Sequence, residues 1–227
     1  RLVRDWSSDV CSSDLVIANR ASQILGGDLG SKLVHPNDHV NMGQSSNDVI
    51  PTSIHLAALL SIKEDLIPSL QFLADELNKK SVEFWPIVKT GRTHLQDATP
   101  VRLGQEFKGF AGQTEYSVQR LQRAQEALAE VALGGTAVGT GVNTHEEFSE
   151  RACKTVSEVS GVLIKETANH VQAQASLDGL VEASGELKTI AISLHKIAND
   201  IRFIASGPRD RKSTLRNPSP GLTPDAC

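Results

Sequence analysis

Hydrophobic residues recur at helical spacing along three long stretches of the chain. An apolar side chain every three or four residues places a stripe on one face of an α-helix. The first stretch, residues 51–84, predicts a helix in which Pro51 suits the first turn and Pro68 should produce a kink. Its predicted buried face carries Leu56, Leu59, Leu66, Leu70, Leu73 and Leu77.

A second helix is expected to begin after Pro100. It should stop at Gly134-Gly135, because glycine commonly ends a helix. Its predicted buried face carries Leu103, Phe107, Phe110, Thr114, Val118, Leu121 and Leu128. A shorter helix should follow Thr144, and its inward-facing residues should be Phe148, Ala152, Val156 and Val159.

The most regular pattern lies between residues 180 and 204, where two rows of apolar residues repeat every seven positions. The rows are Leu180, Leu187, Leu194 and Ile201, and Ala183, Ile190, Ile197 and Ile204. Two such rows form the seam of a helix that packs lengthwise against others. The predicted fold class is therefore all-α, an elongated helical bundle. Continuous stripes of this length favour packing against partner subunits, and a monomeric four-helix bundle is the alternative.

The two ends of the chain lack these patterns. Residues 1–15 repeat a Ser-Ser-Asp phrase without helical or strand periodicity. Residues 207–227 are basic and contain Pro208, Pro218, Pro220 and Pro224. We expect both segments to be foreign to the fold or to be disordered tails. Between these ends, residues 16–48 precede a predicted central bundle of long helices, residues 49–206.

Composition narrows the classes of function. The chain has 23 Lys and Arg against 27 Asp and Glu, so it offers no electrostatic reason to bind nucleic acid or an anionic membrane. No apolar run approaches the roughly 20 residues that cross a bilayer. Cys11, Cys153 and Cys227 lie far apart, which argues against a disulfide framework or a structural zinc site. This cysteine usage favours a reducing, cytoplasmic compartment.

Polar islands at residues 35–48, 89–97 and 133–143 separate the predicted helices, and such segments often carry function. Ser45, Ser46 and Asn47 immediately precede the first helix. Hydroxyl, amide and free helix N–H groups at that point would suit a carboxylate. The same residue types also serve as a simple helix N-cap, so the pattern leaves both interpretations open.

The other islands carry further candidates. His94 could act as a general acid–base or orient a water, because histidine titrates near neutral pH, or it could be a surface residue. Arg92 could pair with a substrate carboxylate or with an acidic neighbour. The segment His35-Pro36-Asn37-Asp38-His39 matches no standard zinc or calcium spacing, so it predicts a small anion-binding or structural turn and no metal site. Residues 133–143 lack the ending of a P-loop, which argues against nucleotide binding.

Taken together, the islands closely resemble class II fumarase, within the fumarase/aspartase superfamily. The resemblance extends over residues 16–207 and implies that residues 16–48 are the remnant of an N-terminal domain. It rests on His35-Pro36-Asn37-Asp38, Gln44-Ser45-Ser46-Asn47-Asp48, Gly91-Arg92-Thr93-His94-Leu95-Gln96-Asp97-Ala98-Thr99-Pro100 and Gly134-Gly135-Thr136-Ala137-Val138-Gly139-Thr140-Gly141. Aspartases resemble the third phrase but typically carry Gln where this chain has His94. The resemblance therefore favours water over ammonia as the group that is eliminated.

The resemblance implies reversible trans addition of water to fumarate to give L-malate, without metal or organic cofactor. His94 would hold the reacting water or move its proton. The residues implied to bind the substrate carboxylates are Ser45, Ser46, Asn47 and Thr93. A second, peripheral dicarboxylate site without a catalytic role would comprise His35, Pro36, Asn37 and Asp38. Family active sites combine segments from three subunits of a homotetramer, so the expected partners are fumarate, L-malate and further copies of the chain.

The family also carries a Gly-Ser-Ser-x-x-Met-Pro-x-Lys-x-Asn loop that supplies a catalytic serine, and the fumarase-like sequence stops before it, near Ser206-Gly207. We therefore expect a fragment of fumarate hydratase that is inactive as written. The alternatives are a non-enzymatic helical assembly module and another lyase of the superfamily, acting on aspartate, argininosuccinate or adenylosuccinate. A cytoplasmic location is expected, and a mitochondrial one stays open.

Overall fold

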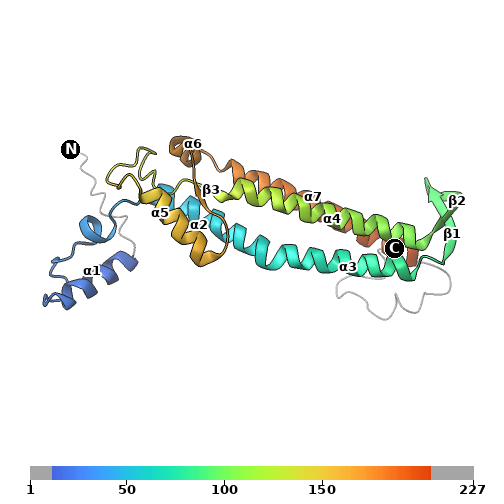
Figure 1. Cartoon of the computed structure of the whole chain (residues 1–227), viewed down its shortest axis with the longest axis horizontal. Coiled ribbons are helices and arrows are strands. Elements are labelled where there is room, and N and C mark those ends of the chain that lie inside the picture. The colour runs from blue at the N-terminus through green and yellow to red at the C-terminus, as the bar shows by residue number, and fades with distance from the viewer. Residues whose placement is uncertain (1–11, 206–227) are drawn as a thin grey trace, which may run out of the picture. The chain divides into compact units, whose positions relative to one another are not determined.

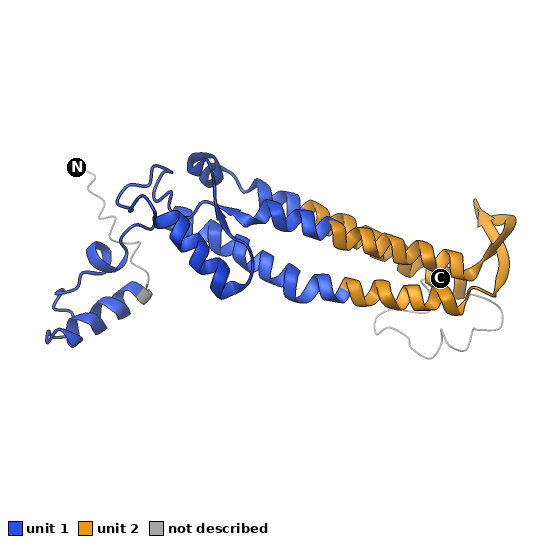
Figure 2. Ribbon diagram, in the orientation of Figure 1, with its two compact units in different colours: residues 1–69, 120–184 blue, residues 70–119, 185–227 orange. Residues whose placement is uncertain are grey.

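The computed structural model describes residues 12–205 (Figure 1). The chain falls into two compact units (Figure 2): unit 1 contains residues 1–69 and 120–184, and unit 2 contains residues 70–119 and 185–227. Helices dominate both units and the strands are short, which confirms the predicted all-α helical bundle. Predictions about Cys11, Cys227, the four tail prolines and the first Ser-Ser-Asp phrase concern positions outside the described residues.

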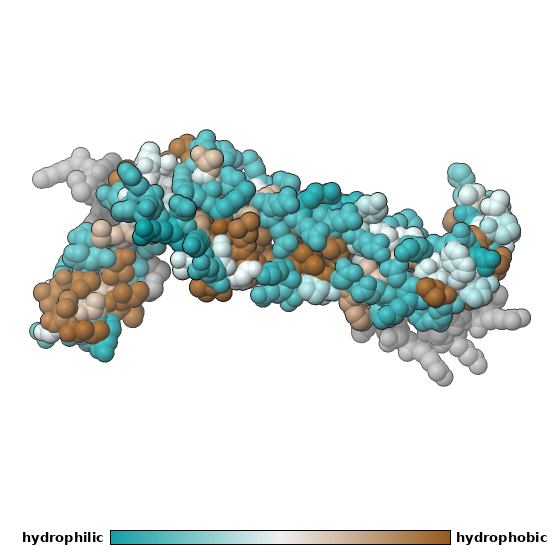
Figure 3. Space-filling view, viewed as in Figure 1, coloured by the Kyte–Doolittle hydropathy of each residue, from teal (hydrophilic) through white to brown (hydrophobic). Residues whose placement is uncertain are grey.

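Unit 1 opens with helix α1 (Ser12–Ile24), so residues 12–15 are helical although their sequence shows no helical periodicity. The π-helical turn η2 (Pro36–Val40) packs against α1. Between them, the Val34 N–H donates to Ser22 Oγ at 3.0 Å. On the face seen in Figure 3, hydrophobic side chains gather over α1. The exposed apolar residues of this helix and the residue after it are Leu15, Val16, Ile17, Ile24 and Leu25.

The first predicted helix consists of α2 (Ser46–Ser61), a π-helical turn η3 (Ile62–Leu66) and α3 (Ile67–Glu83). It begins before Pro51, which therefore lies inside α2 and not in the first turn as predicted. The reason is a capping box at residues 45–48, which starts the helix earlier.

The π-helical turn η3 ends two residues before Pro68. In a regular helix the Pro68 ring would meet the carbonyl of Glu64, and a wider turn at that carbonyl relieves the contact. The predicted apolar stripe is largely confirmed, because Leu59, Leu70 and Leu77 are buried.

Unit 2 packs the end of α3 against α4 (Leu103–Ala129) and α7 (Asp178–Ala205). The Phe107 ring meets Phe84 and Phe110 edge-on, with centroids 5.0 and 5.6 Å apart. These contacts confirm that the predicted stripes face one another. The core consists of Leu77, Phe110, Ala111 and Ile197, with Leu73, Phe107, Ile201 and Ile204 packed against it.

Helix α7 follows the predicted heptad pattern, but its two rows differ in burial. Ala183, Ile190 and Ile197 are at most 4% exposed. In the other row, Leu187 is 41% exposed. One row therefore forms the core within the chain, and the second is only partly covered.

Helix α4 ends at Ala129 and not at Gly134 as predicted. The cause is a tertiary contact, since Glu130–Val131 (β3) pairs in parallel with Lys165–Glu166 (β4). Residues that pair in a strand cannot continue a helix.

The short helix α5 (Phe148–Ser160) exists, but its predicted inward face is only partly correct, because Phe148, Ala152 and Val156 are half-buried. Its buried residues are Ser149 and Cys153, while Val159 is 84% exposed. A Cβ on Gly134 would lie 1.7 Å from Ser149 Oγ, so the neighbouring backbone approaches too closely for a larger side chain. Close packing against that backbone requires small residues on this side of α5. Helix α6 (His170–Ala175) comes after α5 in the sequence.

Residues 88–102 form an antiparallel hairpin that the sequence did not predict. It pairs β1 (Val88–Thr93) with β2 (Gln96–Arg102). His94 and Leu95 form its two-residue turn, with φ values of 51° and 61°. Most hairpin side chains are exposed on both faces, so no apolar alternation marks the strands. No helix among residues 12–205 is long and apolar enough to cross a membrane.

Candidate functional site

The N-terminus of α2 presents the first group of predicted site residues. Ser45 is the N-cap, and its Oγ accepts the Asn47 N–H at 3.2 Å. Ser46 and Asn47 form the first turn, and both are exposed. The two interpretations of this segment are therefore compatible, because Ser45 caps the helix while its neighbours remain accessible to a ligand.

Asp48, the next residue, is fully buried. Its Oδ1 accepts the Ser45 N–H at 2.9 Å. Its Oδ2 accepts the N–H groups of Gly134 and Thr136, at 3.1 and 2.8 Å. One carboxylate therefore joins the start of α2 to a segment almost ninety positions later in the sequence. The sequence offered Asp48 as part of a motif but gave no signal of these partners.

That segment, residues 133–143, is called the glycine loop below. Gly134, Thr136 and Gly139 have φ values of 93°, 56° and 88°, a conformation that glycine adopts easily and threonine does not. The loop is held from α2 as well as from α6. Asn47 Nδ2 donates to Ala137 O at 2.8 Å, and Gln174 Nε2 donates to Thr136 O at 2.7 Å.

Between these elements lies an open groove of about 900 Å³. Ser46 and Asn47 line one side, Ala137 and Val138 of the glycine loop line another, and Gln174 of α6 contributes a third. A hydroxyl and an amide at a helix N-terminus are neutral donors with a favourable dipole. The groove is therefore chemically suited to a carboxylate.

The second group of predicted residues lies in unit 2. Thr93 and His94 are exposed, Thr93 at the end of β1 and His94 in the turn of the hairpin. His94 lines a cavity of about 700 Å³ together with Lys89, Arg92 and Glu106. An exposed imidazole beside such a cavity is accessible to water and to a ligand.

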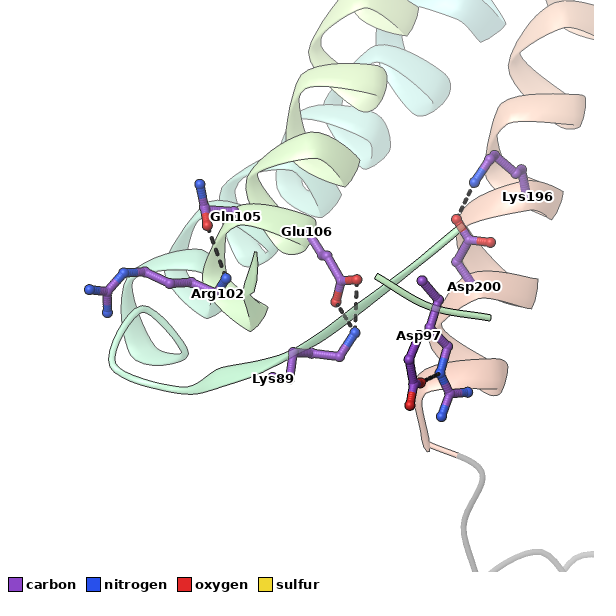
Figure 4. A network of polar contacts seen from close by, with 8 residues as sticks. Lys89, Asp97, Arg102, Gln105, Glu106, Lys196 and Asp200 are labelled. Atoms are coloured by element: carbon purple, nitrogen blue, oxygen red, sulfur yellow. Dashed lines mark hydrogen bonds and ion pairs between the residues drawn. The ribbon is translucent and has the colours of Figure 1, made fainter. Parts of the chain in front are cut away.

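Ion pairs and hydrogen bonds surround that cavity (Figure 4). Lys89 Nζ lies 2.9 and 3.0 Å from the two carboxylate oxygens of Glu106. Arg92 Nε lies 3.7 Å from Asp97 Oδ1, and its guanidinium lies over the Phe203 ring.

Lys196 pairs with Asp200 one turn along α7. The contact between Arg92 and Asp97 matches one of the two roles predicted for Arg92, pairing with an acidic neighbour.

The third group, His35 to Asp38, forms the start of η2. His35 Nδ1 lies 3.3 Å from the Asp38 N–H and 3.2 Å from Asp38 Oδ2. In the neutral ring, His35 Nδ1 can accept a hydrogen bond from the Asp38 N–H. In the protonated ring, the same nitrogen can donate to Asp38 Oδ2. His35 N–H also donates to His39 Nδ1 at 2.8 Å. The segment is a self-contained turn, as predicted, and Asn37 is partly accessible.

The predicted site residues are divided between the two units. Unit 1 contains residues 35–38 and 45–47, and unit 2 contains Thr93 and His94. Within residues 12–205, no three His, Cys, Asp or Glu side chains are grouped so that they could hold a metal ion.

Comparisons with known proteins give consistent matches. A family model described as "Lyase" matches residues 11–219. A class II fumarate hydratase from Nitrosomonas europaea is 55% identical over 195 residues, covering 86% of this chain and 42% of the relative. A mitochondrial fumarate hydratase from Rhizopus oryzae is 54% identical, with 86% and 40% covered.

The solved class II fumarase from Schistosoma mansoni superposes with a TM-score of 0.79 at 35% identity, covering 86% of this chain and 45% of that one. The chain thus spans about two fifths of the length of the curated relatives.

Proposed function

The chain belongs to the lyase family, and from this membership we propose that the protein is a fumarate hydratase, which adds water reversibly to fumarate to give L-malate. The similarity to class II fumarate hydratases extends over most of the chain. The observation that carries the proposal is the exposure of Ser46 and Asn47 in the groove at the start of α2.

The chemistry of hydration explains why this groove matters. Addition of the water oxygen to one alkene carbon of fumarate leaves a carbanion on the other carbon, and its charge spreads into the adjacent carboxylate. Protonation of that carbon completes L-malate, and removal of the same proton from L-malate regenerates the carbanion. Preorganised neutral donors stabilise such charge more in the transition state than in the substrate. We assign this role to Ser45, Ser46 and Asn47, with Thr93 contributing a hydroxyl to the substrate carboxylates.

His94 is assigned to the water. Its exposed ring lies in a tight turn, so the hairpin fixes its position while leaving the imidazole accessible. A neutral imidazole can accept a proton from water, and the protonated ring can return it in the reverse direction. We propose that the protein forms a homotetramer whose subunits share their active sites, as the family resemblance implies.

Two further assignments follow from the resemblance. His35, Pro36, Asn37 and Asp38 would form the peripheral dicarboxylate site. The relatives include bacterial class II enzymes and mitochondrial enzymes, and we propose a cytoplasmic location, in keeping with the spacing of the cysteines.

The experiment that tests the proposal is the conversion of fumarate to L-malate, followed by the loss of ultraviolet absorbance of fumarate. Measured in a full-length fumarate hydratase that contains this sequence together with the catalytic-serine loop, His94→Asn should reduce kcat by about 10²- to 10⁴-fold, the usual effect of losing a general acid–base. The matched control is His145→Asn, because His145 is exposed near α5 in unit 1 and has no assigned role. Light scattering after size-exclusion chromatography should give the same oligomer for all three proteins.

The outcomes separate the candidate functions. Near-normal turnover in His94→Asn would remove this residue from the mechanism. Ammonia release from L-aspartate, or cleavage of argininosuccinate or adenylosuccinate, without fumarate hydration would place the protein elsewhere in the superfamily. A stable oligomer without any of these activities would favour an assembly role.

A further inference from the structure

We propose that Asp48 is a positioning residue that holds the glycine loop as the second wall of the carboxylate-binding groove and thereby sets the orientation of Asn47. This assignment rests on the proposed function for the identity of the ligand. The positioning itself rests on contacts within unit 1.

The first observation is the pattern of donors around Asp48. All three hydrogen bonds to its carboxylate come from backbone N–H groups, one at the cap of α2 and two in the glycine loop. Two N–H groups that converge on one oxygen form an anion-binding concavity in the backbone, and here the protein's own carboxylate fills it. A fully buried carboxylate needs such donors, since an uncompensated buried charge is strongly unfavourable.

The second observation is the contact made by the next residue. The Asn47 side chain donates to Ala137 O, one residue beyond the Thr136 N–H that Asp48 holds. This bond fixes which end of the Asn47 amide faces the loop, and it leaves the second N–H of Nδ2 for a ligand. If the loop moves, the Ala137 carbonyl moves with it, and the Asn47 amide loses its fixed orientation.

The third observation is that the loop is also part of the groove surface. Ala137 and Val138 line it together with Ser46 and Asn47. The ligand is therefore expected to lie between the start of α2 and the glycine loop. The distance between these walls depends on the Asp48 carboxylate, because it bonds to both.

Asp48→Asn tests this role with little change in size. An asparagine cannot accept all three N–H groups, because its Nδ2 must face either Ser45 or the loop. In the wild-type chain, the Gly134 and Thr136 amides should exchange slowly with deuterium although they lie outside any helix or strand. In the variant their exchange should accelerate by about tenfold or more, as a charge-assisted hydrogen bond is lost. Asp75→Asn, an exposed carboxylate on α3, is the control and should leave these amides unchanged.

Unprotected Gly134 and Thr136 amides in the wild-type chain would overturn the proposal without any variant, which covers the case that Asp48→Asn fails to fold. A spectroscopic readout addresses Asn47 directly. The side-chain amide signal of Asn47, assigned by its loss in Asn47→Ala, should shift toward that of a free amide in Asp48→Asn. An unchanged signal would show that Asp48 does not position Asn47.

Kinetics distinguish positioning from general destabilisation. In a full-length fumarate hydratase that contains this sequence and the catalytic-serine loop, Asp48→Asn should raise KM for fumarate by about tenfold with a smaller change in kcat, the result expected for weaker binding of the carboxylate. When Asn47 is already replaced by alanine, Asp48→Asn should raise KM for fumarate much less, because the Asn47 amide that Asp48 positions is absent. Equal effects in both backgrounds would refute positioning through Asn47. If the wild-type protein does not hydrate fumarate, the proposed function fails, while amide exchange and the Asn47 signal still decide the role of Asp48.

Discussion

Gly134→Ala is the sharpest test of how the glycine loop packs against α5. Gly134 has a φ of 93°, which L-residues rarely adopt. An added Cβ would lie 1.7 Å from Ser149 Oγ and 2.8 Å from Ser149 Cβ. The hydroxyl could rotate away, but the Cβ of Ser149 could not, so the loop or α5 would have to shift.

Two effects set the magnitude. Holding an L-residue at positive φ costs about 1–2 kcal/mol. Forcing an extra methyl into a packed site costs about 1–3 kcal/mol. The free energy of unfolding should therefore fall by about 2–5 kcal/mol. In the double variant Gly134→Ala, Ser149→Gly, the cost of the steric clash should be removed, and the cost of holding alanine at positive φ should remain.

The assay is urea denaturation followed by far-ultraviolet circular dichroism. Gly185→Ala is the control, because Gly185 lies within α7 and a Cβ there would meet nothing within 4 Å. That change should stabilise the protein by about 0.5–1 kcal/mol, since alanine favours the helix. If Gly134→Ala lowered the free energy of unfolding by less than about 0.5 kcal/mol, the close packing described above would be contradicted. The same would hold if adding Ser149→Gly recovered none of the lost stability.

Two further predictions concern the core of unit 1. Leu121→Ala should lower the free energy of unfolding by about 2–5 kcal/mol, because Leu121 is fully buried, whereas Leu163→Ala at a 68% exposed position should change it by less than about 0.5 kcal/mol in the same denaturation assay. Burial, aided by the charge of Glu166, raises the pKa of the Cys153 thiol from 9.0 to about 11. Mass-spectrometric mapping should therefore show little alkylation of Cys153 by iodoacetamide at pH 8 until urea unfolds the chain, and rapid alkylation of the folded chain would contradict its burial. The stabilisation linked to this thiol is complete below pH 9.0 and is lost as the pH rises through about 11, so the wild-type protein should lose more stability over that range than Cys153→Ala.

Local periodicity was sufficient to predict most of the helices. The spacing of Ala183, Ile190 and Ile197 identified the buried row of α7, and the spacing of Phe110 and Leu121 identified the buried face of α4. These predictions succeeded because a helix turns every 3.6 residues, so the side that faces the core can be read from neighbouring positions alone. Class II fumarase motifs likewise stand in the sequence as continuous phrases.

Features that depend on distant residues could not be read in this way. The hairpin at residues 88–102 is exposed on both faces and leaves no alternating apolar pattern. The inward face of α5 was predicted only in part, because a glycine backbone fifteen positions earlier favours small residues at its fully buried positions.

Asp48 shows the same division between sequence and structure most clearly. The sequence by itself offered Ser45 and the residues after it, Asp48 included, as a candidate N-cap of the first helix, since capping depends on residues a few positions apart. Only the tertiary structure decided that the same carboxylate also binds Gly134 and Thr136. A buried carboxylate takes whatever donors the fold brings to it, and the fold, not the local pattern, determines which backbone groups those are.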